Sequence, residues 1–114
     1  ALFLGKHGFD ELRLFLAIPP AILSNRLAKF VTLGILRKES HDETPRRKFY
    51  RLTEKGLELF PIVIFTVDWG NRWLTAHPEN FRILHTTCGA TLRPSLNCSH
   101  CQEHLQRQTV QLIP

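Results

Sequence analysis

The fold of this chain is decided by residues 8–36, whose sequence is GFDELRLFLAIPPAILSNRLAKFVTLGIL. The stretch divides at Pro19-Pro20, because the residue before a proline is pushed out of the α-helical region while proline itself suits the first turn of a helix. We therefore expect one helix from about Gly8 to Leu16, with Asp10 near its amino end, and a second helix that begins near Pro20.

The second expected helix carries its apolar side chains on one face. Leu23, Leu27 and Phe30 lie at positions i, i+4 and i+7, and Gly34 follows as a C-terminal stop. The residues that face away are small, polar or basic: Ala21, Ser24, Asn25, Ala28 and Lys29. Two helices joined by a short turn, the second with a small and polar outer face, are typical of a helix-turn-helix.

Further along the chain, residues 35–39 and 48–52 bracket the polar stretch 40–45, SHDETP. Because a proline is excluded from the inside of a strand pair, we expect a hairpin with a long tip. Thr53 then offers a hydroxyl cap for a helix that runs from Leu57 to Trp73 and is apolar on most sides. Pro61 is compatible with a kink or with the first turn of a second helical segment.

An apolar helix of this kind needs burial on both faces. In so small a domain one face can pack on the chain's own core, and the other then needs a partner chain, so the pattern favours a dimerisation helix. The alternative is a central core helix.

The chain has 114 residues, of which 43% are hydrophobic and 22% are charged. A domain of this size buries about two-thirds of its unfolded surface, so it can hold a core without disulfide bonds. No apolar run approaches the about 20 residues of a membrane span, and the start lacks the features of a signal peptide. We therefore expect one soluble, cytoplasmic domain. Since the chain contains no methionine, Ala1 is not an initiator, and we expect upstream residues to be missing.

The net charge of +5 is confined to residues 1–56, because the basic and acidic residues of the remainder balance. A localised basic surface is the electrostatic signature of a protein that binds a phosphate backbone. A merely solvated surface is the alternative, so the motifs must decide between the two.

These motifs resemble the HxlR type of winged helix-turn-helix transcriptional regulator, a bacterial and archaeal family. The resemblance runs from about residue 3 to residue 73 and rests on five pieces in a fixed order: Gly8-Phe9-Asp10-Glu11-Leu12, Ile22-Leu23-Ser24-Asn25-Arg26-Leu27 leading to Gly34-Ile35-Leu36, Pro45-Arg46, Tyr50-Arg51-Leu52-Thr53-Glu54-Lys55-Gly56, and Trp69-Gly70.

The resemblance implies an α+β winged helix-turn-helix that acts as a homodimer on an inverted-repeat operator. Residues 20–32 would be the recognition helix in the major groove, and residues 39–47 the wing beside it. We expect a DNA-binding region over residues 1–56 that lacks the family's N-terminal helix, a dimerisation helix over 57–77 and a cysteine-rich tail over 78–114. Double-stranded DNA and a second copy of the chain are the expected partners, without a membrane.

Within this frame, side-chain chemistry suggests which residues contact DNA. Asn25 can pair bidentately with adenine, and Ser24 and Ala21 are small enough to let the helix approach base edges. The candidates for phosphate contacts are Arg26, Lys29, Arg46, Arg47 and Lys48. For Arg26 an intramolecular ion pair is an equally good interpretation.

The tail carries the motif His85-x2-Cys88-x9-Cys98-x2-Cys101. Two residues separated by two others can turn both side chains to one ion, and two such pairs make the tetrahedral site typical of structural zinc. We therefore predict zinc bound by His85, Cys88, Cys98 and Cys101, in a tail resembling a zinc knuckle. The imidazoles at positions 100 and 104 could replace His85, and a redox pair or inert thiols are the other interpretations.

The main hypothesis is thus a dimeric, DNA-binding transcriptional regulator with a structural zinc. The alternative is a winged-helix module for protein interaction or redox sensing without its own operator. An enzyme is not expected, because no acid and base groups are paired at a nucleophile's spacing.

Overall fold

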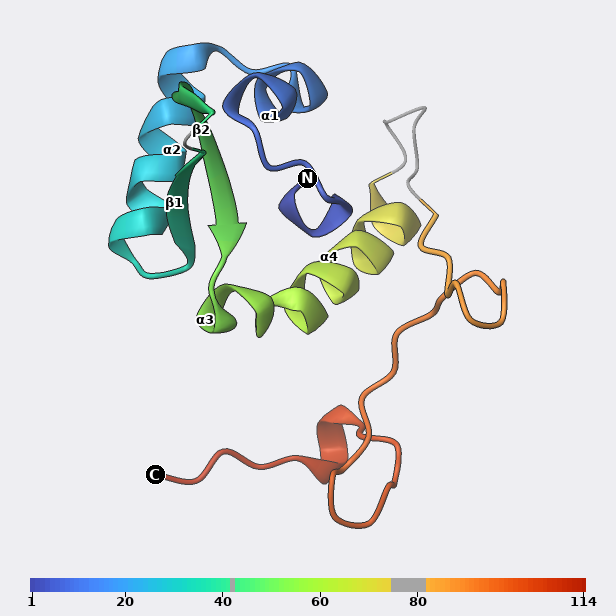
Figure 1. Ribbon diagram of the computed structural model, residues 1–114. Helices are drawn as coiled ribbons and strands as arrows, with labels where there is room; N and C mark the ends of the chain where they lie inside the picture. Colours follow the sequence, from blue (N-terminus) through green and yellow to red (C-terminus); the bar gives the residue numbers. More distant parts are fainter. Residues whose placement is uncertain (42, 75–81) are drawn as a thin grey trace. The chain divides into compact units, whose positions relative to one another are not determined.

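The computed structural model describes residues 1–41, 43–74 and 82–114 (Figure 1). The chain divides into two compact units, Ala1–Pro61 and Ile62–Pro114. The first unit holds, in order, the 3₁₀ turn η1 (Leu2–Leu4), α1 (Phe9–Leu16), α2 (Pro20–Thr32), β1 (Leu36–His41), β2 (Thr44–Leu52) and α3 (Glu54–Leu57). Helix α4 (Phe60–Trp73) begins at the end of this unit, and the second unit also contains the 3₁₀ turn η2 (Arg107–Thr109).

The two helices predicted around the double proline are confirmed. Helix α1 ends where Ala17 takes a left-handed φ of 50°, and α2 has Pro20 in its first turn. Past the end of α2, Gly34 has a φ of 72°, a conformation that glycine adopts without steric cost. The α1–turn–α2 unit is therefore a helix-turn-helix.

The hairpin differs from the prediction at its tip. Strands β1 and β2 pair from Leu36 with Leu52 outward to His41 with Thr44, so the tip is short and Pro45 lies within β2. The register shifts between Ser40 and His41, and an irregular ladder tolerates a residue that lacks a backbone N–H. The long tip was predicted because a proline does not fit inside a regular strand pair. The irregular register at this point allows Pro45 to lie within β2.

The segment before α1 runs beside the hairpin. Gly8 forms a bridge with Phe49, and the backbone N–H of Tyr50 donates to the His7 carbonyl at 2.9 Å. This isolated bridge joins the amino end of α1 to β2, so the helix-turn-helix and the hairpin are held together.

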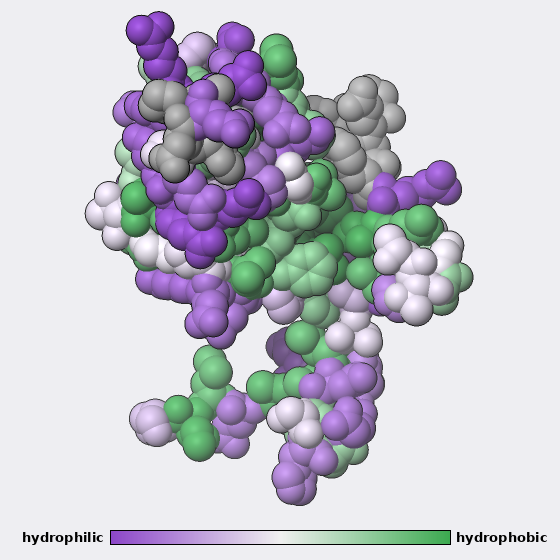
Figure 2. Space-filling view, viewed as in Figure 1, coloured by the Kyte–Doolittle hydropathy of each residue, from purple (hydrophilic) through white to green (hydrophobic). Residues whose placement is uncertain are grey.

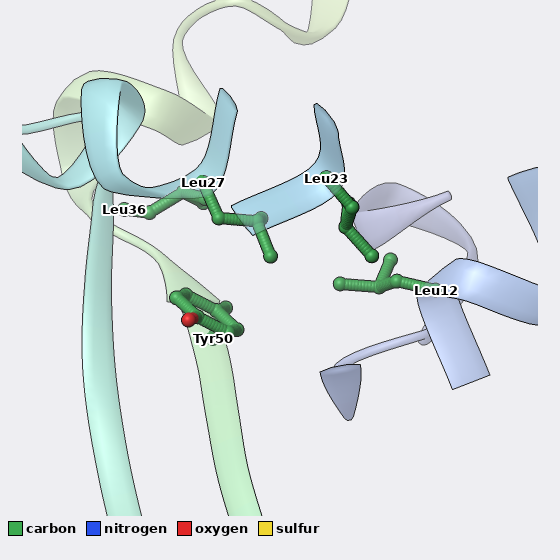
Figure 3. Packing of buried hydrophobic residues seen from close by; sticks show 5 residues of the cluster. All are labelled: Leu12, Leu23, Leu27, Leu36 and Tyr50. Carbon is green, nitrogen blue, oxygen red and sulfur yellow. The ribbon is translucent and has the colours of Figure 1, made fainter. Parts of the chain in front are cut away.

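The hydrophobic core of the first unit draws on both helices and both strands (Figure 3). Its buried members are Leu12, Leu23, Leu27, Leu36 and Tyr50. The two leucines predicted for the inner face of α2 are confirmed as core residues. Phe30 lies at the edge of that face and remains 40% exposed.

The helix predicted from Leu57 to Trp73 is divided in two near Pro61. The Thr53 side chain accepts a hydrogen bond from the Gly56 N–H, as a cap should, but α3 ends at Leu57 and α4 starts at Phe60. Pro61, in the first turn of α4, lacks the N–H that would continue an α-helix from residue 57. The proline thus starts a second helical segment, which was one of the two outcomes expected for it.

Helix α4 buries none of its residues. The expectation that one face packs into the chain's own core is therefore not met. Among the described residues no single helix is long and apolar enough to span a membrane, and only α1 and α2 together, across a bend of 118°, pass a test of length and composition.

Candidate nucleic-acid interface

The outer face of α2 presents three of the predicted DNA-contacting residues. Ala21, Asn25 and Lys29 follow one another at intervals of four residues, so they lie along one face of the helix, and all three are exposed. This face lies opposite Leu23 and Leu27, which α2 buries in the core. Burial of those leucines therefore determines which side chains of α2 are free to meet a ligand.

A groove of about 740 Å³ lies between α2, the amino end of α1 and the hairpin. Ser24 and Ala28 line it from α2, a quarter of a turn from the outer face. The complete lining is Gly8, Phe9, Asp10, Glu11, Ser24, Ala28, Val31, Lys38, Arg46, Arg47, Lys48, Phe49 and Tyr50. Small side chains on the helix and basic ones on the hairpin thus face the same space.

Four cations of the hairpin line this groove, and we refer to them as the wing cations: Lys38, Arg46, Arg47 and Lys48. Lys38 is opposite Tyr50 and Lys48 is opposite Ser40, so the two lysines are diagonal neighbours on one face of the hairpin. The charge of the Lys48 ammonium group lowers the pKa of Lys38. Positive charge is therefore concentrated beside the groove.

The opposite face of the hairpin contains a counter-charge within the chain. Glu39 accepts hydrogen bonds from Arg37 Nε at 2.8 Å and from Arg51 Nε at 3.0 Å. These two bonds lower the pKa of Glu39. By contrast, none of the ion pairs among the described residues involves a wing cation. The hairpin thus has one face with internal counter-charges and one face that lacks them.

The acidic residues of the groove have partners of their own. Glu11 accepts hydrogen bonds from Lys6 and from the His7 N–H, and these lower its pKa. Asp10 lies 3.8 Å from Arg13. Both carboxylates belong to the first turn of α1, where the helix dipole also favours negative charge. Because these two carboxylates pair with other residues, no ion pair among the described residues gives a wing cation a counter-ion.

The structure separates Arg26 from the wing cations. Arg26 is two residues from Ser24 on α2 and therefore points to the other flank of the helix, away from the groove. It is exposed, and none of the ion pairs among residues 1–41, 43–74 and 82–114 includes it. The intramolecular ion pair considered for Arg26 is not formed.

Sequence reasoning missed Lys38, which belongs with the wing cations. The sequence feature that could have identified Lys38 is the two-residue alternation of side chains along β1, which puts Lys38 on the same face as the buried Leu36. The register with β2 was also needed, because it brings Lys48 beside Lys38.

The predicted metal ligands lie in the second unit as two separate pairs. His85 Nδ1 is 3.2 Å from Cys88 Sγ. Hydrogen bonds from the backbone N–H groups of Cys101 and His100, and from the Cys101 thiol, lower the pKa of Cys98. No group of three or more metal-binding side chains is brought together within the parts of the chain that are described. Zinc binding therefore stays a prediction.

Helix α4 is notable for the apolar surface that it exposes. The exposed fractions are 61% for Ile62, 53% for Trp69 and 69% for Trp73. Viewed as in Figure 1, Figure 2 shows hydrophilic residues gathered over the hairpin and hydrophobic residues along α4. On this face of the molecule, hydrophilic residues thus prevail over the hairpin and hydrophobic residues along α4.

Comparisons with known proteins also indicate a helix-turn-helix transcriptional regulator. Residues 1–78 match the HxlR-like helix-turn-helix family. The HTH-type transcriptional regulator MT3179 of Mycobacterium tuberculosis, itself uncharacterised, is 36% identical over 110 residues, which is 95% of this chain and 69% of that protein. An uncharacterised HTH-type regulator of the archaeon Methanothermobacter thermautotrophicus is 34% identical over 67% of this chain and 58% of its own length.

Solved structures share the fold. The crystal structure of the candidate transcription factor PA1607 superposes with a TM-score of 0.84 at 24% identity and covers 98% of this chain and 79% of that one. The candidate transcription factor PA1374 of Pseudomonas aeruginosa gives a TM-score of 0.72 at 27% identity, over 99% of this chain and 79% of its own.

Proposed function

The chain belongs to the HxlR-like helix-turn-helix family, which comprises DNA-binding transcriptional regulators and not enzymes, and from this premise we propose that it acts as a homodimer on an inverted-repeat operator. The observation that carries the proposal is the groove, where the exposed face of α2 and the uncompensated wing cations adjoin. An α-helix fits the major groove of B-DNA, and cations at its flank meet the phosphates of the groove wall.

The residues of α2 would divide the work of recognition. Asn25, on the outer face, would pair with adenine, while Ala21 would allow close approach and could contact a thymine methyl group. Ser24 faces the groove and would reach a base edge or a phosphate on the side of the wing. Lys29 and Arg26 are three residues apart on α2 and therefore lie on adjoining positions of the helix, so both would reach phosphates on the side away from the wing.

The wing cations would supply most of the affinity. Four positive groups that take part in none of the ion pairs among the described residues form a surface that a phosphate backbone would neutralise. A phosphate near Lys38 and Lys48 would also relieve the repulsion between the two ammonium groups. Because phosphate contacts carry no sequence information directly, this part of the interface would position the protein and leave base selection to α2.

Helix α4 supports the homodimer. Its exposed tryptophan and aliphatic side chains form an apolar surface that a monomer would leave in water, and burial of such surface favours association by about 25 cal/mol per Å². A second copy of α4 is the partner we propose, since a twofold dimer presents two α2 helices in the symmetry of an inverted repeat.

Selection of bound sequences from a random pool of duplex DNA tests this function. We expect two half-sites related by inversion, with centres about 10–10.5 base pairs apart or a multiple of this. Affinity should fall as the salt concentration rises, because bound phosphates release counter-ions. Failure to enrich any sequence, with binding insensitive to salt, would favour a module for protein interaction instead.

The same selection with Asn25→Ala tests the readout. The substitution should cost about 1–3 kcal/mol on the best site and little on unrelated duplexes, because it removes one bidentate base contact. Lys55→Ala is the matched control, since the Lys55 ammonium group already donates to the Leu33 carbonyl at 2.7 Å and lies outside the groove. An unchanged consensus for Asn25→Ala would show that Asn25 does not read a base.

A further inference from the structure

The second unit contains two turns of the same backbone design, one over residues 85–90 and one over residues 98–103. In the first, the His85 N–H donates to the Ala90 carbonyl at 2.9 Å and the Gly89 N–H donates to the His85 carbonyl at 2.8 Å. In the second, the Cys98 N–H donates to Glu103 at 2.9 Å and the Gln102 N–H donates to Cys98 at 2.9 Å. Each bond of one turn has its counterpart 13 residues later.

The flanking residues obey the same offset. Leu84 bridges Thr91, and Asn97 bridges His104. The Leu92 N–H donates to Ile83 at 2.7 Å, and the Leu105 N–H donates to Leu96 at 2.8 Å. Figure 1 shows the two turns as separate loops, drawn in orange and in red-orange. Four equivalent interactions in each half identify a repeated hairpin.

The fifth residue of each turn has a left-handed backbone. The φ values are 73° at Gly89 and 63° at Gln102. Glutamine rarely adopts this conformation, so its presence here indicates that the turn geometry itself is required. In such a turn the first and fourth side chains lie on the same side, as the 3.2 Å between His85 Nδ1 and Cys88 Sγ demonstrates.

We propose that the two turns are the two halves of one zinc site, in which His85 and Cys88 bind the ion together with Cys98 and Cys101. Three thiolates and one imidazole are a ligand set that forms closed, tetrahedral zinc sites. Each turn supplies a pair of ligands, and since no group of three is assembled among the described residues, metal binding would have to bring the two pairs together. The ion is the element that joins the halves.

A structural need for the ion is visible in the same segment. None of the described residues from 62 to 114 is buried, so this part of the chain has no hydrophobic core. Segments shorter than about 40 residues commonly depend on metals, disulfide bonds or association for stability. Zinc binding supplies folding free energy directly, and nine residues between Cys88 and Cys98 leave enough chain for the two hairpins to meet.

The equivalence of positions 13 residues apart also indicates which histidine would bind the zinc ion. His85 occupies the first position of its turn, which Cys98 occupies in the other. The two other imidazoles of the tail have different positions: His100 is third in its turn, and His104 lies beyond it, opposite Asn97. The sequence left these three histidines as alternatives, and the offset of 13 residues assigns His85.

Metal binding by the whole chain tests the site. Protein purified without chelators should contain about one zinc per chain, and cobalt(II) added to the metal-free protein should give the intense visible bands of a tetrahedral, thiolate-bound ion. Loss of an outer-shell partner alone costs metal affinity about 10–100-fold, so Cys98→Ser and His85→Ala should weaken cobalt binding by at least that factor. His85→Cys should restore binding, with a spectrum shifted by the fourth thiolate.

The matched controls are His100→Ala and His104→Ala, which should leave cobalt binding unchanged. Loss of binding in either control, with none in His85→Ala, would overturn the assignment. A reversible disulfide between Cys98 and Cys101 without bound metal would replace the zinc site by a redox pair. Metal-dependent association of chains, stronger at higher protein concentration, would show that the halves meet between two copies. The outcome is independent of DNA binding, because the ligands lie outside the groove.

Discussion

At the scale of single residues, the chemistry of the proposed interface depends on which cations have a counter-ion inside the chain. Arg37 and Arg51 share Glu39, whereas the wing cations have no carboxylate partner among the described residues. Charge alone therefore does not distinguish the arginines of this hairpin. The strand register separates the charged residues into two groups, because it places Glu39 on one face of the hairpin and Lys38 with Lys48 on the other.

We expect Arg46→Ala together with Arg47→Ala to weaken binding to all duplexes alike. Each phosphate contact contributes about 0.9 to the slope of log affinity against log salt, so the pair should flatten that slope by about one to two units. Fluorescence anisotropy at several salt concentrations measures both effects.

Arg37→Ala is the control for this double substitution. It removes a positive charge from the same hairpin, but the Arg37 guanidinium is bonded to Glu39 and lies on the other face. Its effect on the slope should be small. A slope that changes equally in the control would mean that net charge, and not the groove, governs binding.

At the scale of elements, the approach of α3 to the base of the hairpin, at Ile35 and Leu52, requires a residue without a side chain. A Cβ on Gly56 would collide with the Ile35 carbonyl oxygen and lie 2.9 Å from Leu52 Cδ2. Thr53 ties the same elements together, because its hydroxyl group contacts the Gly34 and Ile35 carbonyls and caps α3. Residues 52–56, with the sequence Leu-Thr-Glu-Lys-Gly, thus pack together as one small unit.

Gly56→Ala should lower the free energy of unfolding by about 1–3 kcal/mol, as overpacking does in a rigid site. Gly70→Ala in α4 is the control. Its new Cβ would lie 3.8 Å from Leu74 Cδ1, an ordinary contact, and alanine favours a helix over glycine by up to about 1 kcal/mol. Urea denaturation monitored by circular dichroism compares the two, and equal stability would contradict the close approach at Gly56.

At the scale of the whole molecule, each unit has a different physical character. The first has a core of five buried residues and carries a net charge of +4, from 11 basic and 7 acidic residues, while the second has no buried residue among those described. Helix α4 starts at the boundary and exposes apolar side chains. Association through α4 would supply the burial that a single chain lacks.

We expect Trp69→Asp to convert the proposed dimer into a monomer, because a charge buried in an apolar interface is costly. The monomer should bind a half-site weakly, since the second half-site no longer adds avidity. Sedimentation equilibrium reports the mass, and circular dichroism should remain close to that of the parent because α4 contributes no buried residue. An unmutated chain that stays monomeric at high concentration would contradict the dimer.

The sequence by itself determined the helices of the first unit and their inner face. The double proline, the spacing of Leu23 and Leu27, Gly34 and the Thr53 cap act through local backbone preferences, which do not depend on distant contacts. The spacing of His85, Cys88, Cys98 and Cys101 in the tail can likewise be read from the sequence without knowledge of distant contacts. The family resemblance followed from the same motifs in order.

Only the tertiary structure decided how these parts meet. The pairing of β1 with β2 carried Pro45 into a strand through an irregular register, brought Lys38 to Lys48, and gave Arg51 an internal partner in Glu39. The equivalence of the two tail turns is visible in their hydrogen bonds, because their sequences share only the fourth residue, Cys88 or Cys101. Strand register joins residues that are separated along the chain, so no local pattern specifies it.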